Sequence, residues 1–107
     1  VKQEMTGELS RPALETLTIV AYRGPIMKAE IEQIRGVNCS IILRNLLIRG
    51  LVEATEDKKQ MQISYNITLD FLKYLGINHQ SDLPDYDKLN SNESIEKVLT
   101  PEEKEEK

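Results

Sequence analysis

The chain has 107 residues, one cysteine, one histidine and a formal net charge of −4. A length of this order favours one domain. Cys39 can form no internal disulfide, and His79 lies about forty residues away, so the two define no metal site. No signal peptide or bilayer-spanning run is visible, so we expect a cytoplasmic protein with no membrane contact.

The charge is unevenly distributed along the chain. Residues 10–75 carry nine Lys or Arg against seven Asp or Glu, a net +2, whereas residues 76–107 carry a net −5. A DNA-binding module normally has a basic surface, because phosphate neutralisation supplies most of its affinity. We therefore predict a linker over 1–8, a nearly neutral folded domain over 9–77, and an acidic, mostly disordered tail over 78–107 with a short helix near 93–99.

The first predicted helix begins at Ser10, a good N-cap, with Pro12 in the first turn. Its apolar stripe includes Leu14, Leu17 and Ala21. Gly24-Pro25 ends it, with the glycine suited to a left-handed cap. Residues 26–27 then form a short extended piece.

Two short helices follow, joined by a glycine turn. The second helix covers about 28–35, and we expect Ala29, Ile31 and Ile34 on its buried side. After Gly36, Asn38 caps a third helix over about 39–49. This pattern is typical of a helix-turn-helix.

Strands and a further helix complete the predicted domain. Residues 51–55 form a strand, and Met61, Ile63 and Tyr65 alternate with polar residues as in a half-buried second strand. Thr68 caps a fourth helix over 69–75. The predicted fold is α+β, mainly α: a winged helix-turn-helix with a three-helix core, a two-stranded wing and one further helix.

The third helix is the one that such a fold presents to a partner. At about 100° per residue, one side is expected to be core: Ile42, Leu43, Leu46 and Leu47. The opposite side holds the candidate partner-binding residues: Ile41, Arg44, Asn45 and Ile48. Exposed isoleucines beside Arg and Asn favour a protein interface. The alternatives are that other parts of the fold cover them, or that the helix reads DNA.

Tyr22 and Arg23, at the end of the first helix, form a second candidate partner contact. We expect Cys39 to be a small buried residue and His79 a solvated loop residue. No constellation of catalytic, cofactor-binding or metal-ligating residues is apparent, so the sequence predicts a protein that is not an enzyme.

Several segments together resemble one family, the C-terminal winged-helix domain of bacterial segregation and condensation protein B. The resemblance covers about 9–84. Its specific part is the run AEIEQIRGVN at 29–38, and it continues in these segments and positions: 9–17, 19–22, 25–26, Arg44, 46–47, 49–51, Tyr65, Thr68, 71–72, 74–76 and 82–84. The sequence departs from the family pattern at the start of the third helix, at Ile48, at Met27 and in a shorter wing.

The resemblance implies a non-enzymatic subunit of the bacterial condensin-like complex, acting in chromosome condensation and segregation in the nucleoid. Its expected partner is the kleisin subunit and, through it, the coiled-coil ATPase. Family proteins dimerise through an N-terminal domain, so a fragment without it is expected to be monomeric. DNA binding is expected to be weak and non-specific at most. The rival function is that of a winged-helix, DNA-binding transcription regulator.

Overall fold

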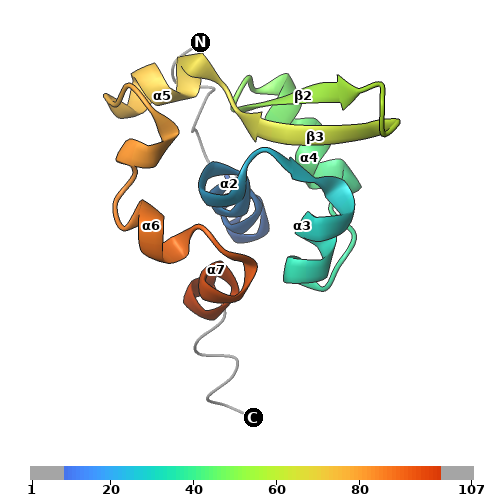
Figure 1. The fold of residues 1–107 in the computed structure, drawn as a ribbon, viewed down its shortest axis with the longest axis horizontal. Coiled ribbons are helices and arrows are strands. Elements are labelled where there is room, and N and C mark those ends of the chain that lie inside the picture. The colour runs from blue at the N-terminus through green and yellow to red at the C-terminus, as the bar shows by residue number, and fades with distance from the viewer. Residues whose placement is uncertain (1–8, 100–107) are drawn as a thin grey trace.

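The structure, a computed structural model, describes residues 9–99, without the side chains of residues 92 and 98. The predicted linker over 1–8 and the tail after residue 99 lie outside this part. The elements are α2 (Arg11–Arg23), β1 (Ile26–Met27), α3 (Lys28–Arg35), α4 (Ser40–Ile48), β2 (Val52–Asp57), β3 (Gln62–Ile67), α5 (Leu69–Leu75), the 3-10 helix η1 (Gln80–Asp82), α6 (Tyr86–Leu89) and α7 (Asn92–Leu99). A mainly helical α+β fold is thus confirmed (Figure 1).

The sheet has three antiparallel strands in the order β1-β3-β2. The hairpin of β2 and β3 pairs Val52 with Ile67 at its base and Asp57 with Gln62 near its tip. The short piece before α3 joins it as a third strand, with Ile26 opposite Tyr65. Three helices followed by this hairpin match the arrangement that we predicted as a winged helix.

Helix α2 lies at the centre of the molecule, with the sheet, α3 and α4 on one side and α6 and α7 on another (Figure 1). Because several elements pack around it, α2 buries residues on more than one face. Apart from Thr16 and Cys39, the largest fully buried side chains are aliphatic: Ile19, Val20, Ile26, Ile31, Leu43, Leu46, Leu51, Val52 and Ile95. Burial of such side chains contributes about 1.5–3 kcal/mol each.

The helix boundaries follow the caps that the sequence predicts. The Ala13 backbone N–H donates to Ser10 Oγ at 3.2 Å, and the Phe71 N–H donates to Thr68 Oγ1 at 3.0 Å. Gly36 ends α3 with φ 78°, a conformation that glycine adopts without a Cβ penalty. The observed ends of α2, α3 and α5 lie within one residue of the ends predicted from these local signals.

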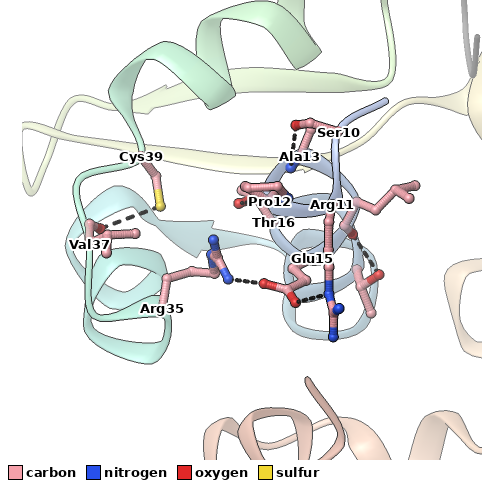
Figure 2. A network of polar contacts seen from close by, with 11 residues as sticks. Ser10, Arg11, Pro12, Ala13, Glu15, Thr16, Arg35, Val37 and Cys39 are labelled. Carbon is pink, nitrogen blue, oxygen red and sulfur yellow. Dashed lines mark hydrogen bonds and ion pairs between the residues drawn. The ribbon is translucent and has the colours of Figure 1, made fainter. Parts of the chain in front are cut away.

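A polar network joins α2 to α3 (Figure 2). The Glu15 carboxylate accepts from Arg35 Nη1 and from Arg11 Nε, the latter at 3.3 Å. The side chains of Glu15 and Arg35 are 15% and 12% exposed, whereas that of Arg11 is 76% exposed. The inner pair is therefore the one that loses most hydration on folding.

Four predictions about individual residues are wrong. Leu14 is 50% exposed and Ala29 is exposed, because the elements packed around α2 and α3 do not reach these positions. Met61 is 86% exposed in the turn before β3, since strand pairing begins only at Gln62. Gly24 has an extended backbone, φ −61° and ψ 149°, not a left-handed one. Position 24 requires glycine because there is no room for a side chain: an added Cβ would lie 2.5 Å from the Val20 carbonyl oxygen.

We predicted a mostly disordered segment after residue 77, with a short helix near 93–99. The short helix is present as α7, but the prediction of disorder is wrong for the residues before it, which form η1 and α6. Gln80 Nε2 donates to the carbonyl oxygens at the end of α2, at 3.4 Å to Val20 and 3.3 Å to Gly24. Ile95 of α7 is fully buried. These contacts join residues that lie far apart in the chain, and the acidic composition of the segment does not predict contacts of this kind.

Candidate partner-binding face on helix α4

Helix α4 divides into a buried and an exposed side, as its sequence predicts. Leu43 and Leu46 are 1% and 0% exposed, with Ile42 and Leu47 partly buried against the same core. On the other side, Ile41 is 77% and Ile48 is 73% exposed. Seven residues make about two helical turns and rise about 10 Å, so the two isoleucines lie one above the other along the helix.

Arg44 and Asn45 lie between the two isoleucines in the sequence, and both are exposed. We name this set Ile41, Arg44, Asn45 and Ile48 the outer face of α4. Two large aliphatic side chains with a guanidinium and an amide between them offer apolar contact and directional hydrogen bonds together. All four side chains are exposed, which confirms the prediction that they share the exposed side of α4. Their role in binding a partner stays a prediction.

Glu32 of α3 and Asn38 of the turn both accept from backbone N–H groups at the N-terminus of α4, whose N-cap is Cys39 and not the predicted Asn38. The Cys39 backbone N–H donates to Glu32 Oε2 at 2.8 Å, and the Ser40 N–H donates to Asn38 Oδ1 at 2.8 Å. Cys39 itself is buried, as predicted, and its thiol lies 3.5 Å from the Val37 carbonyl oxygen (Figure 2). The orientation of α4 is thereby tied to α3 through Glu32.

The same caps affect what this helix end can bind. A helix that contacts DNA phosphates commonly does so with free N–H groups at its N-terminus. Here a carboxylate and an amide oxygen accept from the amides of Cys39 and Ser40. Lys28 Nζ lies 3.7 Å from the same Glu32 oxygen and offsets its charge, so the obstacle to phosphate is that these two N–H groups already have acceptors.

The hairpin next to α4 adds acidic and apolar surface. Residues 53–57 of β2 are all exposed and include Glu53, Glu56 and Asp57. Asp57 Oδ1 accepts from the Lys59 backbone N–H at 3.0 Å, which shapes the turn. Met61 and Ile63 are 86% and 50% exposed. Three carboxylates against two lysines do not make the basic tip that a DNA-contacting wing needs.

Tyr22 and Arg23 lie on another element, at the end of α2, and contact residues later in the chain. The Tyr22 hydroxyl donates to the Pro84 carbonyl oxygen at 2.7 Å, and its ring stacks on Tyr86 with centroids 6.1 Å apart. Arg23 Nη1 donates to Asn90 Oδ1 at 3.3 Å. Burial, and then the charge of Asp85, raise the pKa of Tyr22 above its usual value.

Sequence reasoning missed Gln80 and the pairing of Glu15 with Arg35. No local pattern could have identified them, because their partners lie about 56–60 and 20 residues away. Among the described residues, no group of three or more His, Cys, Asp or Glu could hold a metal ion, and His79 is exposed. None of the described helices has the length and apolarity needed to cross a membrane.

Comparison with known proteins identifies the family. The model of the segregation and condensation complex subunit ScpB matches residues 1–86, and the chain belongs to this family. Segregation and condensation protein B of Symbiobacterium thermophilum is 50% identical over 84 residues, which are 77% of this chain and 38% of the relative. That of Streptococcus mitis is 44% identical over 90 residues, 82% of this chain and 48% of the relative.

Solved structures agree with the fold. The crystal structure of ScpB from Mycobacterium tuberculosis superposes with a TM-score of 0.60 at 41% identity, covering 65% of this chain and 44% of that chain. A conserved hypothetical protein from Chlorobium tepidum gives a TM-score of 0.55 at 36% identity, covering 63% and 43% of the two chains. The chain thus spans about half the length or less of these relatives. The family name places it among chromosome segregation and condensation proteins.

Proposed function

We propose that this chain is a non-enzymatic adaptor that binds the kleisin subunit of the bacterial condensin-like complex through the outer face of α4. The observation that carries the proposal is the exposure of Ile41 and Ile48, 77% and 73%, on a helix whose other side is core. In the family's complex, the kleisin would connect the chain to the coiled-coil ATPase. We further propose that the chain corresponds to the C-terminal domain of longer family members.

The energetics of the outer face favour an apolar partner. An isoleucine that stays in water contributes nothing to the free monomer, whereas full burial at an interface contributes about 1.5–3 kcal/mol. Arg44, which lies between the two isoleucines, is of a residue type that is enriched in interface hot spots. An amphipathic helix of the kleisin is the partner that such a surface fits, with Arg44 as the hydrogen-bonding anchor.

The rival function, sequence-specific DNA binding, has less support. The net charge of residues 10–75 is only +2. The backbone N–H groups of Cys39 and Ser40 at the start of α4 already donate to side chains of the protein, and the exposed residues of β2 include three carboxylates, Glu53, Glu56 and Asp57. A sequence-reading helix normally presents several polar or basic side chains to base edges, not two isoleucines.

The proposal is tested by titrating the purified chain into the kleisin subunit of the same cell in a calorimeter. We expect saturable one-to-one binding with a negative heat-capacity change, the signature of apolar burial. A labelled random-sequence duplex serves as the control titrant. Absence of binding to the kleisin, with a cooperative melt showing that the chain is folded, would contradict the proposal.

A further inference from the structure

Strand β2 forms an open edge of the sheet. In the strand order β1-β3-β2 it pairs with β3 on one side, and no other strand in the described part of the chain pairs with its outer side (Figure 1). Residues 53–57 are all exposed. An edge strand presents a row of backbone N–H and C=O groups to which a further strand can be added. The outer side of β2 is therefore a surface that another chain segment can extend.

The pairing with β3 determines which backbone groups of β2 face outward. The Thr68 N–H donates to the Leu51 carbonyl oxygen at 3.2 Å, one step before the first residue pair of the ladder. Hydrogen-bonded pairs alternate along an antiparallel ladder, so the odd-numbered residues of β2 bond to β3. The backbone N–H and C=O groups of Ala54 and Glu56 therefore point to the outer side. Within residues 9–99, no hydrogen bond outside the ladder occupies these groups.

The edge lacks most of the features by which proteins keep edge strands from associating. Those features include prolines, β-bulges, lysines and a covering loop or helix. The six residues of β2 include no proline or lysine, and their register with β3 runs without interruption from Val52 to Asp57. The strand carries carboxylates instead, at Glu53, Glu56 and Asp57. Strand β3 has no charged residue, so these three carboxylates are the whole charge of the two strands.

The charge of β2 favours a basic occupant over a second copy of the chain. Edge-to-edge pairing of two copies would bring three carboxylates from each strand together, and like charges on paired strands are destabilising. A basic segment is attracted by the same carboxylates. Asp57 is already engaged in the turn, where it accepts from the Lys59 backbone N–H. Glu53 and Glu56 are three residues apart, so they lie on opposite faces of the sheet, and the matching segment carries two basic residues with the same spacing.

We propose that the outer edge of β2 binds an extended segment of a partner protein by strand addition, with one basic residue of that segment opposite Glu53 and another opposite Glu56. Backbone hydrogen bonds to Ala54 and Glu56 supply affinity, and the two carboxylates supply specificity. This edge is separate from the outer face of α4, and the inference does not rest on the kleisin binding proposed for that face.

The test is an anisotropy titration of the full chain with the fluorescein-labelled peptide Thr-Val-Lys-Val-Thr-Lys-Val-Thr. We expect saturable binding, and binding at least about tenfold weaker when glutamate replaces both lysines of the peptide. The protein variant with Glu53→Lys and Glu56→Lys should reverse this preference. The matched control combines Asp87→Lys and Glu93→Lys, at exposed positions of α6 and α7. It changes the net charge equally and should keep the preference of the parent chain.

Blocked N–H groups separate strand addition from charge attraction alone. Ala54→Pro removes an outward N–H that the ladder with β3 does not use, and we expect at least about tenfold weaker binding with a cooperative melt. If that variant does not fold, peptides N-methylated at alternate residues replace it: one alternate set should abolish binding to the parent chain and the other should not.

Four results would refute the proposal. They are no binding of the lysine peptide, an unchanged preference in the variant with lysine at positions 53 and 56, equal binding to the parent and to folded Ala54→Pro, and equal binding of the two methylated peptides. Dimerisation of the parent chain that Ala54→Pro abolishes would also refute it, because a second copy would then occupy the edge. Sedimentation of both proteins measures this outcome.

Discussion

Glu15 forms the ion pair that joins α2 to α3. It accepts from Arg35, whose side chain is 12% exposed and whose Nε atom has no hydrogen-bond partner. Glu15→Ala leaves the guanidinium nearly buried without a counterion, and we expect it to lower the free energy of unfolding by about 2–3 kcal/mol, below the 3–5 kcal/mol typical of fully buried pairs. Arg11→Ala removes only the exposed partner and should cost about 0–1 kcal/mol.

Urea unfolding of both variants measures the difference, with the midpoint and slope fitted separately. Similar losses for Glu15→Ala and Arg11→Ala would show that burial does not distinguish the two ion pairs. An unaltered Glu15→Ala protein would mean that Arg35 finds water or another acceptor, and that the contact between α2 and α3 rests on apolar packing.

Gly24 and Gly36 are required for different physical reasons. At Gly36 the obstacle is the backbone angle, φ 78°, because nothing lies within 4 Å of an added Cβ. Gly36→Ala should cost about 1 kcal/mol and Gly36→Asn less, since asparagine tolerates this region. At Gly24 the angle is ordinary but the Cβ would meet the Val20 carbonyl oxygen at 2.5 Å. Gly24→Ala should cost about 1–3 kcal/mol through overpacking.

Thermal melts of the three glycine variants check these expectations. The decisive comparison is between alanine and asparagine at position 36, because the two differ in how well they accept a positive φ. If Gly36→Asn melts no higher than Gly36→Ala, the turn between α3 and α4 has another conformation in solution.

At the scale of elements, the segment from η1 to α6 is attached to α2 partly through Tyr22. Its hydroxyl donates to the Pro84 carbonyl oxygen, and the pKa of the phenol is raised by burial and by Asp85. A group with a raised pKa in the folded state contributes stability below its unfolded pKa, about 10, and that stability is lost as the pH rises through the higher folded value. A phenolate can no longer donate.

We therefore expect the contact of this segment with α2 to persist at pH 8–9 and to weaken only above about pH 10. Absorbance at 295 nm reports phenolate formation, and Tyr22→Phe should remove a component that titrates above the usual tyrosine value of about 10. Amide exchange in residues 80–90 should accelerate over the same pH window in the parent, after correction for intrinsic rates. A Tyr22 component that titrates at or below the usual value would contradict this attachment.

The elements that the sequence predicted well are those with local signals. Ser10, Gly36 and Thr68 mark helix ends by chemistry confined to a few residues, and the periodicity of α4 separates Leu43 from Ile41 without reference to the rest of the fold. The failures concern contacts made over distance in the chain. Residues 80–92 were predicted to be disordered because their composition is polar, and the contacts that order them, such as those of Gln80 with Val20 and Gly24, join distant parts of the chain.

At the scale of the whole molecule, the net charge predicts how strongly the chain binds DNA. The net charge is −4 overall and +2 over residues 10–75, so few phosphates can be neutralised at once. Each phosphate contact adds to the affinity and to its salt dependence. We expect weak binding to random-sequence duplex at physiological salt, without sequence preference. Fluorescence anisotropy measures it, and sub-micromolar binding that survives raised salt would favour the transcription-regulator function instead.

The central claim is that the outer face of α4 binds the kleisin. It is tested most directly by calorimetric titration of the kleisin with Ile41→Asp and Ile48→Asp, each paired with a thermal melt. Ile42→Asp, on the half-buried side of the same helix, is the matched control that should impair folding instead. We predict that each outer-face variant melts like the parent and binds at least about 1–2 kcal/mol more weakly. Unchanged binding by both folded variants would contradict the account.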